Sequence, residues 1–235
     1  MKKITIDPIT RLEGHGKIEI FLNEDGNVEN AYLQVPEFRG FERFCEGRPV
    51  AELARITPRI CGVCPWAHHM ASTKTLDAVF RVQPPPAAAK LREMAYAVYH
   101  FYDKLIHFFF LAAPDFVVGS EAPASQRNVV GLIKKVGPEV GKKVLSVYKD
   151  AQQVLEQLGG RSIHPVWGLP GGVSKGITDE ERTALAEKFR GYVEFAGFCL
   201  ELFNDVVLGD ADYAAIVTGD VYKMESYYMG LVDEK

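Results

Sequence analysis

The spacing of apolar residues changes once along this chain, near Val50, and that change constrains the fold more than any other feature. Between residues 17 and 35, apolar and polar residues mostly alternate, with Asp25-Gly26 supplying a turn, which predicts an antiparallel hairpin. After Val50, apolar residues recur at helical spacing. We therefore predict a mainly α (α+β) protein, in which a helical bundle follows a small N-terminal antiparallel sheet.

The predicted boundaries follow from the same pattern. The sheet lies within about residues 1–49, the bundle covers about residues 50–223, and together they form a single domain spanning residues 1–235. Within the bundle, the spacing predicts helices over residues 50–56, 66–80, 91–109, 138–158 and 179–208. Thr178 and Glu181 have the spacing of a capping box that begins the last of these helices.

Residues 224–235 combine apolar side chains with a charged end, and they predict a strand that leads into a turn. An unpaired apolar strand at the end of a domain would promote aggregation. We therefore expect the C-terminus to be incomplete, or to be completed by a partner.

Charge and hydropathy exclude two classes of partner. The chain carries 27 basic and 31 acidic residues, a formal charge of -4, with no block of like charges, so we expect no nucleic-acid partner. No apolar run approaches the roughly 20 residues that a membrane span needs, and the N-terminus has no apolar signal core. We expect a cytoplasmic protein without a direct membrane span.

A C-x-x-C pair, Cys61 and Cys64, is the chain's main chemical motif, and His68 follows it closely. Two such sulfurs can bind one metal ion, cycle between dithiol and disulfide, or lie buried and inert. We favour metal binding, because the surrounding pattern is not the βαβ context of a redox dithiol. The remaining cysteines, Cys45 and Cys199, stand alone, so a closed four-ligand site needs donors from elsewhere.

Four motifs, in order along the chain, resemble those of the large, catalytic subunit of nickel-iron hydrogenases. They are Asp7-Pro8-Ile9-Thr10-Arg11-Leu12-Glu13-Gly14-His15, Arg39-Gly40-Phe41-Glu42 with Gly47-Arg48, Arg59 to His68, and His164-Pro165 with Pro170-Gly171-Gly172-Val173. The pair His68-His69 is similar to the cytoplasmic, multi-subunit branch. The chain resembles the N-terminal half of such a protein, and the family's second C-x-x-C, near its C-terminus, has no counterpart here.

The resemblance implies a role for each residue of the central motif. Cys61 would be a terminal nickel ligand, and Cys64 would bridge nickel to an iron that carries carbonyl and cyanide ligands. His68 would donate a hydrogen bond to the bridging sulfur, although a histidine with its own partners in the core is the alternative. Glu13 would relay the proton that dihydrogen cleavage leaves on a thiolate, which in this family belongs to the missing C-terminal segment, although a surface or N-capping carboxylate is the alternative.

The resemblance also implies roles for three further residues, Glu42, Arg59 and His164. Glu42 would bind a magnesium ion, or would simply pair with Arg39 or Arg43. Arg59 would help to orient the ligands, or would cap a helix, and His164 would orient them from a later segment.

The resemblance implies an oxidoreductase that cleaves dihydrogen heterolytically and reversibly. Electrons would pass to an iron-sulfur small subunit, then to further electron-transfer subunits, because this chain has no cluster motif. With two cysteines in place of four, the isolated chain is expected to be inactive, and a separate C-terminal chain is a candidate partner. The alternatives are a metal-free, hydrogenase-like structural subunit of a respiratory complex and a simple C-x-x-C metal or redox module.

Overall fold

The computed structural model describes residues 2–220, 223 and 225. The chain divides into two compact units, Met1–Tyr192 and Val193–Lys235. Helices dominate the described residues, which confirms the predicted mainly α class. The strand predicted over residues 224–235 falls outside the described residues, apart from Glu225.

The N-terminal sheet has three antiparallel strands, β1 (Lys2–Ile6), β2 (Lys17–Leu22) and β3 (Val28–Gln34), in the order β1-β2-β3. The predicted hairpin is β2–β3, and its turn places Gly26 at a φ of 83°, where a side chain would be strained. Only the central strand β2 is half-buried, since β1 and β3 are exposed along their whole length. Burial therefore does little to hold this sheet in place.

The α-helices are α1 (Phe41–Cys45), α2 (Leu53–Ile56), α3 (Pro65–Phe80), α4 (Pro86–Ile106), α5 (Ala113–Phe116), α6 (Val129–Val136), α7 (Pro138–Gly159), α8 (Asp179–Phe203) and α9 (Ala211–Thr218). Short 3-10 turns cover Val50–Glu52 (η1) and Thr57–Ile60 (η2), and π-helical segments cover His107–Ala112 (η3) and Asn204–Leu208 (η4). A two-stranded hairpin joins β4 (Gly168–Leu169) to β5 (Gly172–Val173).

Several predicted helices are confirmed with small shifts at their ends. The helix expected over residues 138–158 is α7, and Gly160 ends it in the left-handed conformation at a φ of 73°. The capping box also forms, because the Thr178 N–H donates to Glu181 Oε2 (2.8 Å) and the Glu181 N–H donates to Thr178 Oγ1 (3.1 Å). The helix expected over residues 91–109 is longer at its start, because Pro86 serves as its first residue.

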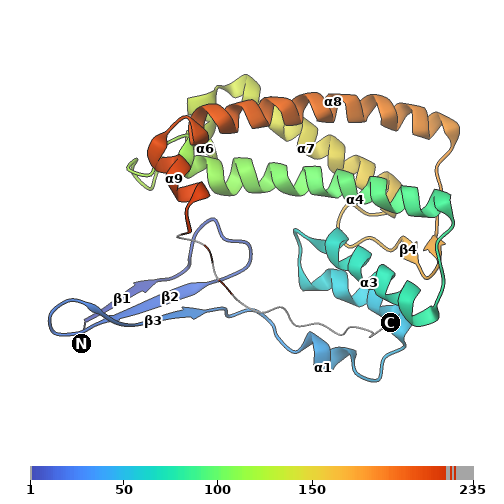
Figure 1. Ribbon diagram of the computed structural model, residues 1–235, viewed down its shortest axis with the longest axis horizontal. Helices are drawn as coiled ribbons and strands as arrows, with labels where there is room; N and C mark the ends of the chain where they lie inside the picture. The colour runs from blue at the N-terminus through green and yellow to red at the C-terminus, as the bar shows by residue number, and fades with distance from the viewer. Residues whose placement is uncertain (1, 221–222, 224, 226–235) are drawn as a thin grey trace. The chain divides into compact units, whose positions relative to one another are not determined.

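The core of the first unit lies where α4 packs beside α7, with α3 and the β4–β5 hairpin at one end (Figure 1). The stretch of α8 up to Tyr192 joins this core, since the Tyr192 ring stacks on Phe101 of α4 and its hydroxyl donates to Asp150 of α7 (2.7 Å). The largest fully buried side chains include Trp66, Trp167, Leu76 and Leu155. Among the described residues, no helix combines the length and apolar character needed to cross a bilayer.

Candidate metal centre

The Cys61–Cys64 loop connects the 3-10 turn η2 to helix α3. Cys61 is extended (φ -140°, ψ 131°), whereas Cys64 is the N-cap residue of α3, directly before Pro65. The Cys64 N–H donates to the Cys61 sulfur over 3.0 Å, and the two Cα atoms are 5.4 Å apart. The prolines on either side restrict the backbone and so reduce the entropy lost when the loop holds both sulfurs together.

The structure joins the two sulfurs in a disulfide. Only the thiolate form of cysteine is a good metal ligand, so this bond must be reduced before either sulfur can bind a metal ion. Once reduced, the loop presents two soft sulfur donors close together in space. Two such donors can occupy two neighbouring coordination positions of one nickel or zinc ion.

Glu13 lies beside this pair, although the resemblance assigned its proton transfer to a thiolate of a C-terminal segment. Its Oε1 is 3.6 Å from the Cys61 sulfur, although the two residues are 48 positions apart in the sequence. Glu13 is exposed and sits in the loop between β1 and β2, which the Ile9 N–H closes by donating to the Gly16 carbonyl (2.9 Å). A carboxylate therefore lies close to a sulfur that becomes a thiol or thiolate, and so a possible proton-transfer partner, once the disulfide is reduced.

Two other predicted site residues are His68, expected to donate to the Cys64 sulfur, and Glu42, expected to bind a magnesium ion. In the described part of the chain, the His68 ring makes no hydrogen bond, so the bond expected from it to Cys64 is not formed, and that sulfur is bonded to Cys61 instead. Glu42 is exposed in the first turn of α1, while Arg43, its suggested partner, pairs with Glu46 (2.6 Å). Among the described residues, no group of three or more His, Cys, Asp or Glu side chains could hold a metal ion.

His164 and Arg59 lie behind the cysteine loop. The His164 Nδ1 is 3.0 Å from the Pro58 carbonyl oxygen, so this nitrogen carries the proton and donates. Burial, together with the positive charges of Arg59 and Arg161, lowers the pKa of His164 below its ordinary value and favours the neutral ring. Arg59 is exposed and lines a groove of about 840 Å³. Basic and aromatic side chains share this groove: Arg48, Arg55, Arg59, Arg161, Phe38, Phe41 and Phe44.

His69, rather than His68, is the buried histidine of the pair. Its ring is 0% exposed, and its Nδ1 donates to the Ala54 carbonyl oxygen (2.9 Å). Its Nε2 accepts from the backbone N–H groups of Gly168 (2.8 Å) and Trp167 (3.3 Å). Burial, assisted by the nearby charge of Arg92, lowers the pKa of His69, so the ring is neutral and holds the segment before β4 against α3.

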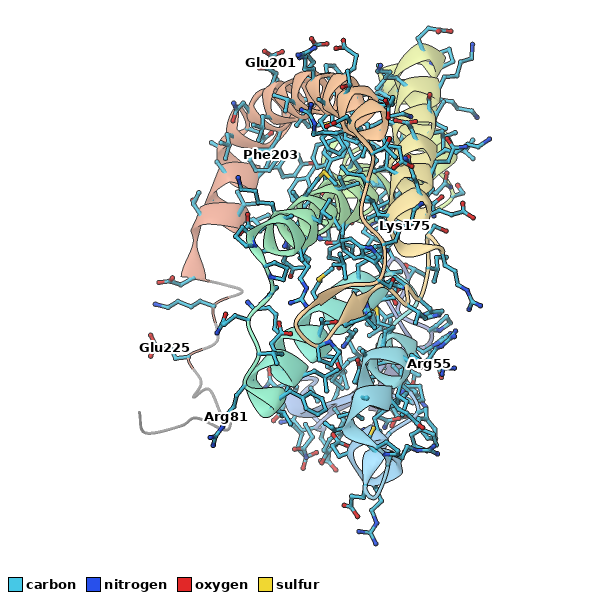
Figure 2. All side chains as sticks on the ribbon, turned by 90° about the vertical axis from the view of Figure 1, so that its right-hand side faces the viewer. Arg55, Arg81, Lys175, Glu201, Phe203 and Glu225 are labelled. Carbon is cyan, nitrogen blue, oxygen red and sulfur yellow. A yellow bond between two sulfur atoms is a disulfide. The ribbon has the colours of Figure 1, made fainter. Side chains whose placement is uncertain are left out.

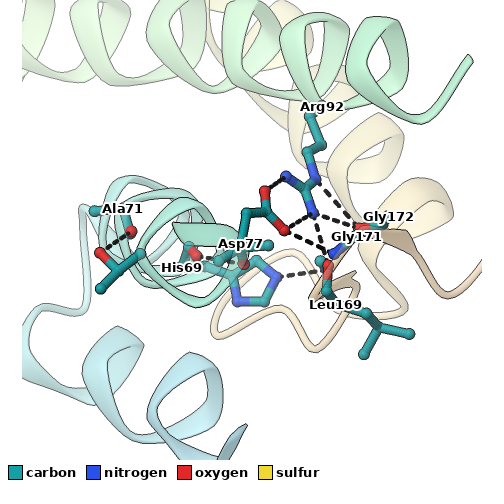
Figure 3. A network of polar contacts seen from close by, with 10 residues as sticks. His69, Ala71, Asp77, Arg92, Leu169, Gly171 and Gly172 are labelled. Carbon is teal, nitrogen blue, oxygen red and sulfur yellow. Dashed lines mark hydrogen bonds and ion pairs between the residues drawn. The ribbon is translucent and has the colours of Figure 1, made fainter. Parts of the chain in front are cut away.

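A buried ion pair completes this attachment (Figure 3). Arg92 of α4 donates to Asp77 of α3 (2.5 Å) and to the carbonyl oxygens of Leu169 and Gly172 (2.7 Å each), while the Gly171 N–H donates to Asp77 (2.7 Å). Burial alone would raise the pKa of Asp77, but the Arg92 guanidinium and the Gly171 N–H outweigh it and lower that pKa.

The segment from Ser162 to Lys175 is therefore fixed along its length. The Trp66 indole donates to the Ser162 carbonyl (2.9 Å), and the Trp167 indole donates to the Lys175 carbonyl (2.9 Å). The Lys175 ammonium, labelled in Figure 2, donates to the Gln157 carbonyl at the end of α7 (3.3 Å). The helix that begins at the cysteines is thus tied to a rigid frame, which favours a fixed ligand geometry.

Comparison with known proteins identifies the family. A profile described as HoxL-like matches residues 3–38, and the profile of nickel-dependent hydrogenases matches residues 39–143, which includes the cysteine loop. This chain belongs to the nickel-dependent hydrogenase family. The resemblance predicted from the motifs is thereby confirmed.

Relatives in this hydrogenase family match almost the whole chain. It is 48% identical to an iron-sulfur subunit of the F420-non-reducing hydrogenase of Archaeoglobus profundus, over 100% of this chain and 48% of that protein. It is 44% identical to a vhu subunit of the F420-non-reducing hydrogenase of Methanocaldococcus jannaschii, over 100% of this chain and 55% of that protein. The chain spans about half the length of the curated relatives it matches.

Solved hydrogenase structures share the fold. An NAD+-reducing [NiFe]-hydrogenase in the H2-reduced state superimposes with a TM-score of 0.84 at 36% identity, covering 92% of this chain and 48% of that one. The Ni-Fe-Se hydrogenase of D. vulgaris Hildenborough, in its as-isolated oxidized state, gives a TM-score of 0.70 at 31% identity, covering 83% of this chain and 42% of that one.

Proposed function

We propose that this chain forms the N-terminal part of the large, catalytic subunit of a nickel-iron hydrogenase, which cleaves dihydrogen heterolytically and reversibly. One observation carries the proposal: Cys61, Cys64 and the Glu13 carboxylate converge from two distant segments, with 3.6 Å between Glu13 Oε1 and the Cys61 sulfur. A hydrogen-cleaving site needs soft ligands for the metal and a base next to one of them.

The two sulfurs are the chain's contribution to the centre. After reduction, Cys61 would be a terminal nickel ligand, and Cys64 would bridge nickel to an iron that bears carbonyl and cyanide ligands. The metal pair, when bound, supplies the redox chemistry that polarises and splits dihydrogen. Because the described residues provide no third or fourth donor, the remaining ligands would come from a C-terminal segment or a separate chain.

The residues around the cysteines would have two roles: proton transfer, and orientation of the metal ligands. Glu13 would accept the proton released at a thiolate and pass it toward solvent, to which it is exposed. His68 and Arg59 would orient the ligands in the assembled enzyme, and Glu42 would bind a magnesium ion through its free carboxylate. Neither assignment requires these side chains to touch the sulfurs in the isolated chain.

Partners follow from the redox chemistry. Electrons would pass to an iron-sulfur small subunit, then to further electron-transfer subunits, in a cytoplasmic, multi-subunit enzyme. The groove lined by Arg48, Arg55, Arg59 and Arg161 lies next to the cysteine loop and would be one surface available to such a partner.

Nickel binding tests the ligand assignment on the chain itself. We expect the dithiothreitol-reduced chain, under anaerobic conditions, to bind Ni²⁺ with sulfur-to-nickel charge-transfer absorption. Cys61→Ser and Cys64→Ser should each weaken binding by at least about tenfold, because each removes one of two thiolates. The matched controls Cys45→Ser and Cys199→Ser should leave binding unchanged, and equal loss in all four variants would overturn the assignment.

The Glu13 role is tested in the assembled hydrogenase. Glu13→Gln should lower dihydrogen oxidation by about 10²- to 10⁴-fold, the usual contribution of a general base, while nickel and iron contents stay unchanged. Full activity in this variant would exclude Glu13 as the proton relay.

A second candidate, a reversible dithiol switch, is favoured by the disulfide between the two cysteines. It predicts that the chain exchanges disulfides with glutathione and fails to bind nickel after reduction. The nickel titration described above therefore separates the two candidates.

A further inference from the structure

The loop that carries Glu13 is anchored far from the sheet to which it belongs. Arg11, two residues before Glu13, has a φ of 53°, so its backbone bends in the left-handed region. Its side chain reaches the segment around α5, where Nη1 donates to the Arg127 carbonyl oxygen (2.8 Å) and Nη2 donates to the Asp115 carboxylate. These contacts join residues 116 and 104 positions apart.

Asp115 is shared between two guanidinium groups. Its second oxygen accepts from Arg127 Nη1 (3.2 Å), and Arg127 is fixed in turn by a bond from its Nε to the Ala122 carbonyl (2.9 Å). The three side chains are partly buried, with 24%, 37% and 31% of Arg11, Asp115 and Arg127 exposed. Charged hydrogen bonds at such sites are screened less than those at the surface.

The conformation of Arg11 is energetically costly in two respects, which indicates that its contacts are strong enough to maintain it. Its Nε is buried and has no hydrogen-bond partner among the described residues. An unpaired buried N–H and a left-handed backbone at a residue other than glycine both oppose this conformation. The contacts to Asp115 and Arg127 must outweigh both terms for the loop to keep this shape.

The other parts of the N-terminal sheet contribute little to holding the loop between β1 and β2 in place. Strands β1 and β3 are exposed along their whole length, so apolar burial fixes the loop between β1 and β2 only weakly. The loop's other ion pair, His15–Glu37, joins it to the segment after β3, whereas the contacts of Arg11 tie it to residues 115 and 127 of the helical bundle.

We infer that Arg11, Asp115 and Arg127 form a clasp that positions Glu13 against the Cys61 sulfur. The clasp residues are positioning residues, since they act through Glu13 and touch neither sulfur. The inference deepens the proposed function and rests on it only for the proton-relay role, because the geometric effect of the clasp exists without any metal.

A thiol-bridging probe tests the geometry in the metal-free chain. Glu13→Cys is introduced together with Cys64→Ser, Cys45→Ser and Cys199→Ser, so that the new thiol and Cys61 are the two thiols of the chain. Dibromobimane becomes strongly fluorescent when it bridges two nearby thiols, and its bridging yield reports their effective concentration. Adding Asp115→Asn should lower that effective concentration by at least about tenfold, which corresponds to about 1.4 kcal/mol.

Two controls make the probe specific. Asp179→Asn removes an exposed aspartate that pairs with Arg182 on α8, and it should leave the bridging yield unchanged. Asp115→Glu keeps the charge and should restore most of the yield. If Asp115→Asn prevents folding, Arg11→Lys replaces it, because an ammonium cannot reach Asp115 and the Arg127 carbonyl together. An unchanged yield in a folded Asp115→Asn or Arg11→Lys chain would overturn the clasp.

A double-mutant cycle in the assembled hydrogenase links the clasp to the relay. Asp115→Asn should lower dihydrogen oxidation in the otherwise unchanged enzyme, but should have no further effect when Glu13→Gln is already present. A purely structural role would lower activity equally in both backgrounds, and that result would also contradict the inference. If Glu13→Gln alone has no effect, the proposed relay fails, whereas the bridging yield still decides whether the clasp exists.

Discussion

The His69 imidazole holds its three partners only in the neutral form, because its Nε2 must accept while its Nδ1 donates. Its pKa is lowered in the folded state, whereas an unfolded histidine titrates near its ordinary value of about 6.5. Below that pH the unfolded chain binds more protons than the folded chain. The free energy of unfolding should therefore fall as the pH drops below about 6.5, and His164 contributes in the same direction.

The measurement is urea unfolding between pH 7.5 and 5. We expect His69→Gln, whose amide oxygen can still accept from Gly168, to lower stability at pH 7 but to flatten its pH dependence. His107→Gln, at an exposed position, should keep the original slope. A slope unchanged by His69→Gln would show that another group titrates.

At the scale of single residues, the sequence predicts partners that lie within one motif, but not partners that lie far along the chain. The motif places Cys61 and Cys64 three residues apart in one loop, whereas the approach of Glu13 to the Cys61 sulfur was not predicted, because the resemblance paired Glu13 with a thiolate of a C-terminal segment. His68 and His69 are indistinguishable by spacing, because the atoms that select His69 belong to Ala54 and Gly168, which are 15 and 99 residues away. The sequence does show two neighbouring histidines near the start of a helix. Because neighbouring side chains on a helix point in different directions, this pair predicts that one histidine is more buried than the other.

Among the elements, one buried ion pair, Arg92–Asp77, links α4 to α3 and both to the β4–β5 hairpin. Arg92 is 8% exposed, and Asp77→Asn would leave its charge without a counterion. Loss of one partner from such a pair costs about 3 kcal/mol or more, so we expect a correspondingly lower midpoint of urea unfolding with an unchanged slope.

The same substitution at an exposed pair serves as the control. Asp179, whose side chain is 90% exposed, pairs with Arg182, and Asp179→Asn should change stability by no more than about 0.5 kcal/mol. Equal effects of Asp77→Asn and Asp179→Asn would mean that the β4–β5 hairpin does not depend on the buried pair.

The long helices could be predicted from periodicity, whereas the short ones could not. Helices α3, α4 and α7 repeat their apolar positions over several turns, and caps or prolines mark their ends. Helices α1, α6 and α9 span five or eight residues each, too few for a repeat to stand out. The π-helical segment His107–Ala112 is present in the structure, and we have no physical account of why this sequence adopts it.

For the molecule as a whole, the exposed sheet governs behaviour in solution. Val28 and Leu33 of β3 are 64% and 67% exposed on a strand whose outer edge is unpaired among the described residues. Such an edge promotes pairing with other chains, so we expect concentration-dependent association in sedimentation velocity.

Leu33→Lys should weaken that association, because a charge on the edge strand opposes pairing. Val193→Lys changes a side chain that is 72% exposed on a helix, where no strand edge is available, and should have little effect. Equal effects of the two substitutions would point to general hydrophobic association instead.

Because the cysteine loop can form a disulfide, we expect the metal content of a preparation to depend on whether it was exposed to oxygen before metal was added. On the proposed assignment, oxidation and nickel binding would draw on the same pair of sulfurs, so the oxidised pair would not bind nickel until a reductant had opened the disulfide. A chain purified in air would thus look like a protein with no affinity for nickel. If Cys61 and Cys64 are the proposed metal ligands, the order in which electrons and metal reach them decides whether the site can be assembled.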